Sequence, residues 1–236
     1  GQETVQTIDI SSLLVPGKKV ACFVGTSKNG TSFIVNHVAE ILSQAGISTA
    51  ILDTTQNRNA YYIYTKNEED LRNVAANCMK NLIDGLARGI QVTKNLAVYT
   101  SLPNENDEMQ RSGEILQTLI KNYAVVLIDC DFQTPLSYFA YAQEIYLIQS
   151  LDVLTIQPLT AFLRELKARN ILDENKLRVV LNKVEKLKGI SDKIILGGMS
   201  SYNDPSMSYM VDLFDKNLIK YISIPFDEQV YVKYLE

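Results

Sequence analysis

A polar, glycine-bearing loop between an apolar strand and a helix carries the clearest chemistry in the sequence. The spacing Gly25-x4-Gly30-x-Ser32 fits the phosphate-binding pattern GxxxxGK(S/T), with Thr31 in the lysine position. In such a loop, successive backbone N–H groups surround the phosphates of a nucleotide, and the helix N-terminus adds partial positive charge. Ser32 keeps the hydroxyl that Mg²⁺ would use. The alternative is a plain strand–turn–helix junction, which the same residues would also form.

A nucleotide in this loop would contact its whole length and the first turn of the following helix. The expected contact residues are Gly25, Thr26, Ser27, Lys28, Asn29, Gly30, Thr31, Ser32 and Phe33. Backbone N–H groups do not depend on side-chain identity, so phosphate binding tolerates changes of side chain here. Lys28 either reaches the phosphates or faces solvent.

Short apolar runs alternate with stretches of helical period along the chain, which predicts an α/β fold. The expected strands are Val20–Val24, Thr49–Asp53, Leu96–Thr100, Val125–Asp131, Glu144–Gln149, Leu177–Leu181 and Tyr221–Ile224. Most of these runs are continuously apolar, which is typical of strands covered on both faces of a parallel sheet. The expected helices are Phe33–Gln44, Glu69–Leu86, Asp107–Asn122, Thr160–Arg169 and Met207–Asn217. We therefore predict a doubly wound, mostly parallel sheet of about seven strands with helices on both faces.

The chain shows no linker rich in Pro, Gly or Ser, so we expect one domain over residues 18–236. Residues 1–17 are expected to be an N-terminal extension or an engineered end of the chain, because the sequence starts at Gly1 without a methionine. The segment 189–205 interrupts the alternating pattern. It is expected to be an irregular surface excursion with a short strand at Ile194–Leu196.

Four further segments follow the loop in a fixed order. They are Ala50–Asn59 with its Asp53-Thr-Thr55-Gln-Asn core, the apolar run from Tyr123 to Asp131, Leu177–Lys183 with Asn182, and Ile222–Val230 with Ile-Pro225-Phe-Asp. Together with the loop, these segments resemble the motifs of MinD/ParA-type P-loop ATPases, the deviant Walker A or SIMIBI class. The resemblance extends over residues 18–230.

The resemblance implies a role for each matching residue. Asp53 is expected at the catalytic end of the second strand. Asp129 is expected to orient Mg²⁺ through water, with Ser32 as the second metal-side residue. Asn182 is expected to read the edge of the adenine, and Pro225 is expected to lie beside the base. The implied cofactors are ATP or ADP, together with Mg²⁺.

The sequence departs from the family pattern at the groups that act on the γ-phosphate. Thr26 stands in place of the signature lysine, Thr31 in place of the usual Walker A lysine, and Thr55 in place of the second aspartate, which helps to place the attacking water. Phosphoryl transfer depends mostly on positioning and charge stabilisation, and removal of one preorganised donor costs on the order of 10²–10³ in rate. We therefore expect hydrolysis near background. The candidate catalytic residues are Lys28, Asp53 and Asp129.

By this resemblance, we expect a nucleotide-governed positioning or assembly factor that forms a homodimer and works with protein partners. The TadZ/CpaE branch, associated with pilus assembly, is a candidate placement. Two alternatives stay open. One is a weak ATPase that partitions plasmid or chromosomal DNA by means of Lys28. The other is an interaction scaffold that keeps only the fold.

The composition argues against several functions. A net charge of −4 and a pI of about 5.2 do not favour broad nucleic-acid binding. The longest apolar runs are well short of the roughly 20 residues of a transmembrane helix. The sequence opens without a recognisable signal peptide, so we expect a cytoplasmic protein. The three cysteines, Cys22, Cys78 and Cys130, have no metal-binding spacing and are expected to be reduced and structural.

Several other residues have two interpretations. His37, the single histidine, is expected to pack or to face solvent. Asp131 is either a second carboxylate near the magnesium or a loop residue. The cluster Tyr61, Tyr62 and Tyr64 is either an interface or buried. The lysines that follow residue 182 are expected to belong to a solvated loop.

Overall fold

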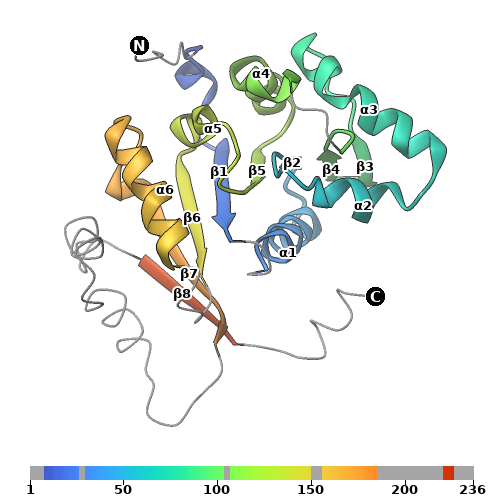
Figure 1. Ribbon diagram of the computed structural model, residues 1–236. Coiled ribbons are helices and arrows are strands. Elements are labelled where there is room, and N and C mark those ends of the chain that lie inside the picture. Colours follow the sequence, from blue (N-terminus) through green and yellow to red (C-terminus); the bar gives the residue numbers. More distant parts are fainter. Residues whose placement is uncertain (1–7, 27–29, 104–106, 150–155, 185–219, 226–236) are drawn as a thin grey trace, which may run out of the picture. The chain divides into compact units, whose positions relative to one another are not determined.

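The computed structural model describes residues 8–26, 30–103, 107–149, 156–184 and 220–225 (Figure 1). Contacts divide the chain into two compact units. The first unit comprises Gly1–Phe23 and Ser32–Gln143, and the second comprises Val24–Thr31 and Glu144–Glu236. The single domain expected over residues 18–236 stays a prediction.

The first unit is built on five strands in the order β3-β4-β2-β5-β1. They are β1 (Lys19–Gly25, whose last two residues belong to the second unit), β2 (Thr49–Asp53), β3 (Ile90–Thr93), β4 (Leu96–Tyr99) and β5 (Val125–Cys130). β2 pairs in parallel with both β4 and β5, whereas β3 pairs antiparallel with β4. The β2–β5 register places Asp53, the last residue of β2, directly beside Asp129.

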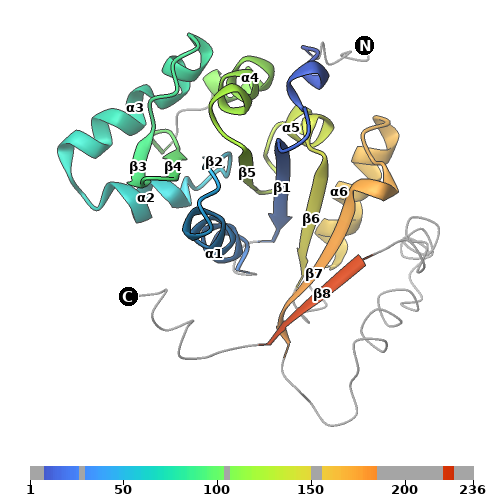
Figure 2. The same cartoon turned by 180° about the vertical axis from the view of Figure 1, so that it is seen from behind.

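The helices of the first unit cover these strands. They are the short 3₁₀ helices η1 (Ser11–Leu13) and η2 (Asp107–Gln110), and the α-helices α1 (Thr31–Gln44), α2 (Asn59–Thr65), α3 (Glu69–Ile83), α4 (Ser112–Asn122) and α5 (Leu136–Tyr141). Viewed from behind, α3 lies alongside β3 and β4 (Figure 2). Every residue of β2 and β4 is buried, and because side chains alternate between the faces of a strand, both faces are covered.

In helix α4, the helical spacing of apolar residues in the sequence matches the face of the helix that is buried. Its apolar side chains recur with helical spacing and are fully buried: Ile115, Leu116, Leu119 and Ile120. The last carbonyl groups of the helix have no partners within it, and Lys18 satisfies one of them together with the carbonyl of Tyr123, the residue that follows the helix. The Lys18 Nζ donates to the carbonyl oxygens of Ile120 at 2.8 Å and Tyr123 at 2.9 Å. One cation therefore fixes the end of α4 to the residue that precedes β1.

The second unit contains three parallel strands in the order β6-β7-β8. Its elements are β6 (Glu144–Gln149), α6 (Ile156–Ala168), η4 (Glu174–Lys176), β7 (Leu177–Val184) and β8 (Lys220–Pro225). Arg178 of β7 lies 4.0 Å from the Glu144 carboxylate of β6. Helix α6 buries Leu159, Phe162, Leu163 and Leu166.

The α/β class and the mostly parallel pairing confirm the predicted fold, and each of the seven expected strands is present. The structure adds β3 and two short helices, α2 and α5, that the sequence pattern did not predict. The helix expected at Met207–Asn217 and the strand expected at Ile194–Leu196 lie outside the described residues. Within the described ranges, every helix is too short or too polar to cross a membrane.

The Lys18 contact gives a first prediction. Lys18→Met keeps the side-chain length but removes the donor to two carbonyl oxygens, so it should lower the free energy of unfolding by about 1–2 kcal/mol. Urea unfolding measures this change. The matched control is Lys121→Met, which removes an exposed cation from α4 itself and should leave the free energy of unfolding within about 0.5 kcal/mol of wild type. Equal effects of the two substitutions would show that net charge, and not the end of α4, is responsible.

Candidate functional site

Gly25, the first glycine of the loop, has close neighbours within the second unit. A Cβ at Gly25 would lie 2.6 Å from Thr31 Oγ1 and 2.7 Å from the carbonyl oxygen of Ile148, so a larger residue cannot stand there without movement of the backbone. Gly30 has a φ of 81°, a conformation that favours glycine. Steric constraints therefore explain why glycine occupies both positions of the motif. Ser27, Lys28 and Asn29 lie outside the described residues.

Thr31, in the lysine position of the motif, is buried and begins helix α1. Within the described ranges, its hydroxyl oxygen has no hydrogen-bond partner. A buried hydroxyl without a partner costs free energy, and a phosphate oxygen would provide one. Thr26, in the position of the signature lysine, is partly exposed and has polar or electrostatic contacts of its own.

Ser32 and Phe33 complete the expected contacts of the loop, and both belong to the first unit. The Ser32 hydroxyl oxygen accepts a hydrogen bond from Asn59 Nδ2 at 3.0 Å and also hydrogen-bonds to the Asp129 carboxyl. The Phe33 ring stacks on His37 of the next helical turn, with ring centroids 5.8 Å apart. His37 is exposed and stacks on an aromatic ring, which agrees with the packing or surface role expected of it.

Asp129 is a buried carboxyl at the end of β5, with 3% of its surface exposed. Burial raises the pKa of Asp129 well above its ordinary value, and the neighbouring Asp53 carboxyl raises it further, whereas the bond with Ser32 lowers it. Among the described residues, nothing hydrogen-bonds to Asp129 Oδ1. An unpartnered carboxylate oxygen beside a hydroxyl is a donor set that suits a hard cation such as Mg²⁺.

The described residues contain no group of three or more His, Cys, Asp or Glu side chains that could hold a metal ion. A magnesium ion held by Ser32 and Asp129 would therefore need phosphate and water oxygens to complete its coordination. Mg²⁺ commonly binds in this way, by one or two protein groups together with substrate phosphates.

Asp53 lies beside Asp129 but has a different environment. Its Oδ1 accepts hydrogen bonds from the backbone N–H of Thr55 at 3.0 Å and from the Thr55 hydroxyl at 2.6 Å. Its Oδ2 accepts from the Ala60 backbone N–H at 2.9 Å and from the Thr100 hydroxyl at 3.2 Å. Burial raises the pKa of Asp53, and these bonds oppose the rise. Asp53 thus fixes the start of α2, and its expected catalytic role stays a prediction.

The loops that follow β2 and β5 are joined by side-chain hydrogen bonds. Asp131 accepts from the backbone N–H of Gln56 at 2.6 Å through Oδ2 and from that of Gln133 at 2.8 Å through Oδ1. The Thr54 and Thr134 hydroxyls lie 3.0 Å apart, and Thr54 Oγ1 also donates to the Asp129 carbonyl oxygen at 2.8 Å. Each oxygen of Asp131 therefore binds a backbone group, which favours the loop interpretation of this residue.

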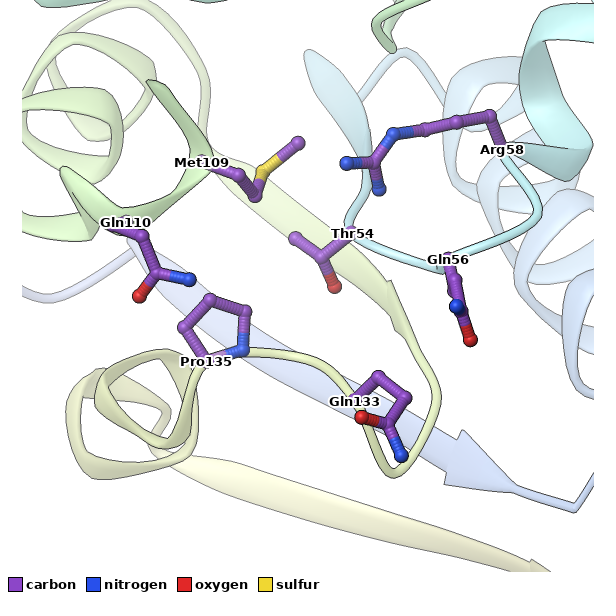
Figure 3. Close-up of a pocket in the computed structure, with 7 residues that line it drawn as sticks. All are labelled: Thr54, Gln56, Arg58, Met109, Gln110, Gln133 and Pro135. Atoms are coloured by element: carbon purple, nitrogen blue, oxygen red, sulfur yellow. The ribbon is translucent and has the colours of Figure 1, made fainter. Parts of the chain in front are cut away.

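A pocket of about 150 Å³ opens between these two loops and η2 (Figure 3). Its lining residues are Thr54, Gln56, Arg58, Met109, Gln110, Gln133 and Pro135. Arg58 is only 1% exposed and donates through Nη1 to the carbonyl oxygen of Thr55. Figure 3 shows its side chain extending toward Met109 and Thr54. Asp53 and Asp131 oppose the lowering of the Arg58 pKa that burial causes.

The sequence pattern missed two residues of this region, Arg58 and Asn59. Arg58 adopts a left-handed backbone conformation with a φ of 50° and immediately precedes α2. A charged residue in a polar stretch ordinarily faces solvent, so sequence alone gave no signal that Arg58 is buried. Asn59 was part of the second-strand motif, but its contact with Ser32, 27 positions earlier, depends on the tertiary structure.

The two residues expected near the base lie on neighbouring strands of the second unit. Asn182 lies within β7, and Pro225 is the last residue of β8, paired with Val184. Their roles stay predictions.

Comparison with protein-family models and with curated proteins finds no match. Solved structures do match over most of the chain. A ParA family ATPase from Chlorobium tepidum TLS has a TM-score of 0.62 at 17% identity, over 92% of this chain and 88% of that one. The MinC:MinD cell division complex of Aquifex aeolicus gives 0.61 at 13%, over 91% and 84%. The ATP complex of a Cyanothece McdA variant gives 0.64 at 14%, over 92% and 86%.

These similarities confirm the fold predicted from the motifs: the chain has the fold of MinD/ParA-type P-loop ATPases. At 13–17% identity, they establish the fold alone.

Substitution by asparagine should change the stability of the protein in opposite directions at the two neighbouring aspartates. Asp129→Asn should raise the melting temperature at pH 7, because the amide removes the cost of a buried carboxylate without a full set of partners. Asp53→Asn should lower the free energy of unfolding by about 2–4 kcal/mol, since an amide group would face two hydrogen-bond donors. Thermal unfolding of both variants beside wild type measures the contrast.

The sign of the pH effect follows from the raised pKa of Asp129. Between the unfolded and folded pKa values, the folded state binds more protons than the unfolded state, so wild-type stability falls as the pH rises through that window. Asp129→Asn lacks this titration. Its gain over wild type should therefore be small near pH 4 and grow toward pH 7. A constant gain at every pH would contradict the assignment.

Proposed function

We propose that this protein binds ATP or ADP together with Mg²⁺, hydrolyses ATP slowly or not at all, and acts as a nucleotide-governed positioning or assembly factor. The observation that carries the proposal is the buried Asp129 carboxyl, which hydrogen-bonds to Ser32 and whose Oδ1 lacks a partner within the described part of the chain. An ionised carboxyl that is buried without a full set of partners is costly, and a bound cation would offset that cost. The fold is shared with a McdA variant that was solved with ATP, which supports a Mg²⁺ ion bound together with a nucleotide at this position.

Each part of the binding proposal rests on a particular group. Backbone N–H groups of residues 25–32 would hold the phosphates, and the Thr31 hydroxyl, which has no partner among the described residues, would donate to one of them. Ser32 and Asp129 would hold Mg²⁺, which supplies positive charge next to the phosphates when it is bound. Asn182 and Pro225 would contact the base by analogy of fold.

The proposed loss of hydrolysis rests on the environment of Thr55. Its hydroxyl donates to Asp53 Oδ1 at 2.6 Å, so its hydrogen is committed to a buried acceptor. A neutral hydroxyl in that arrangement cannot accept the proton of an attacking water as a carboxylate can. Thr31 likewise supplies no positive charge where the motif has a lysine.

The wider roles follow from the same analogy. A protein partner is proposed because one of the matching structures is a complex of MinC with MinD. A homodimer is proposed from the resemblance to MinD/ParA-type ATPases alone. The TadZ/CpaE placement stays a prediction.

Nucleotide binding should appear as thermal stabilisation of the folded chain. At a ligand concentration 100 times Kd, ATP with Mg²⁺ should stabilise the protein by about 2.7 kcal/mol. In a chain of this size that corresponds to a rise in melting temperature of roughly 5–10 °C. ATP with EDTA is the control for the Mg²⁺ contribution and should give a smaller rise. Absence of any shift with ATP or ADP would leave the interaction scaffold as the better interpretation.

Hydrolysis should be near background even when ATP binds. Phosphate release from saturating ATP should be at least about 10²-fold slower than the 1–100 s⁻¹ of an active kinase. Thr55→Val is expected to leave this low rate unchanged. Faster turnover that disappears in Lys28→Ala would instead support the weak ATPase that uses Lys28.

A further inference from the structure

Asn59, the first residue of α2, contacts the hydroxyl that the proposed function assigns to Mg²⁺. Its side-chain Nδ2 donates to Ser32 Oγ at 3.0 Å. Both residues belong to the first unit, and Ser32 also hydrogen-bonds to Asp129. The Ser32 hydroxyl therefore lies between an amide and a carboxyl group, and each of these constrains its orientation.

The hydrogen-bonding capacity of a serine hydroxyl is small. It has one hydrogen to donate and two lone pairs to accept with. Beside a bound cation Asp129 would be ionised, and an ionised carboxylate can only accept, so the hydroxyl hydrogen would point toward it. The Asn59 N–H occupies one lone pair. Among the contacts that the structure describes, one lone pair of Ser32 is left.

We propose that Asn59 is a positioning residue for the metal that accompanies the nucleotide. It holds the Ser32 hydroxyl so that the remaining lone pair can bind Mg²⁺. This inference rests on the proposed function, because it concerns the same hydroxyl. Partners that orient a metal ligand in this way fix its direction and strengthen binding.

The position of Asn59 is itself fixed by neighbouring hydrogen bonds. The Ala60 backbone N–H donates to Asp53 Oδ2 at 2.9 Å, which anchors the first turn of α2. Near the other end of this helix, the Tyr64 hydroxyl donates to Asn36 Oδ1 at 2.8 Å. Among the described contacts, Asn59–Ser32 and Tyr64–Asn36 attach α2 to α1, and of these two bonds the first involves the expected metal ligand.

This pair of bonds provides a matched control. Asn59→Ala and Tyr64→Phe each remove one bond between α1 and α2, but only Asn59→Ala changes the orientation of Ser32. If Asn59 merely stabilises the start of α2, the two variants should behave alike. If it positions Ser32, Asn59→Ala alone should change the dependence of nucleotide affinity on Mg²⁺.

The experiment is calorimetric titration of the full chain with ADP, in Mg²⁺ and in EDTA. For wild type, Mg²⁺ should increase the affinity. Asn59→Ala should reduce that increase on the order of tenfold and leave the affinity in EDTA unchanged. Tyr64→Phe should keep the wild-type increase. In a Ser32→Ala background, Asn59→Ala should have no further effect, because the two residues act through one hydroxyl.

The outcomes separate this inference from the proposed function. Absence of ADP binding by wild type would overturn both. ADP binding that does not depend on Mg²⁺, or an Asn59→Ala variant with the wild-type Mg²⁺ dependence, would overturn the inference and leave nucleotide binding intact. An equal loss of affinity in Mg²⁺ and in EDTA would reduce Asn59 to a structural residue. If Asn59→Ala does not fold, Asn59→Leu removes the donor with little change in volume.

Discussion

Two buried carboxyl groups stand side by side at the ends of β2 and β5, and the arrangement of the candidate site depends on how each is compensated. The parallel register pairs Asp53 with Asp129. An ionised carboxylate in a protein interior is costly unless donors surround it. Asp53 has four donors, whereas Asp129 has the Ser32 bond and an Oδ1 without a partner in the described residues. Burial raises the pKa of both side chains, but it is less compensated at Asp129 than at Asp53.

The four donors of Asp53 also explain why the loop after β2 is ordered. They come from Thr55, Ala60 and Thr100, so satisfying one carboxylate fixes the loop, the start of α2 and the end of β4 together. Thr55 stands where the family motif has an aspartate, but its hydroxyl is one of these donors. An aspartate at position 55 would bring a second negative charge against Asp53 instead of a donor. Thr55 therefore stabilises the local structure through a hydrogen bond that the aspartate of the family motif would not donate.

The sequence was sufficient for the parts of the fold that local patterns determine. Continuous apolar runs such as Val125–Ile128 predict buried parallel strands because both faces of the strand must be apolar. Strand β3 was missed because three of its four residues are exposed, so its pattern resembles a loop. Helix α2 was missed because seven residues with three tyrosines have little helical signal, and tertiary bonds such as Tyr64–Asn36 stabilise it. Burial of Arg58 and the contact of Asn59 with Ser32 depend on distant residues that no local pattern contains.

Binding and hydrolysis have different physical requirements, and the proposed function depends on this difference. Backbone N–H groups hold phosphates whatever the side chains are, whereas hydrolysis needs cations and a group that orients water. In the proposed function, Thr31 and Thr55 lack the charge and the carboxylate that hydrolysis needs, whereas the backbone N–H groups that would hold the phosphates are unchanged. A scaffold that binds no nucleotide would gain nothing from Asp129, because an amide or an apolar residue at the end of β5 would be more stable. The presence of a carboxyl group there, hydrogen-bonded to Ser32, is thus better explained by a bound cation than by the fold alone.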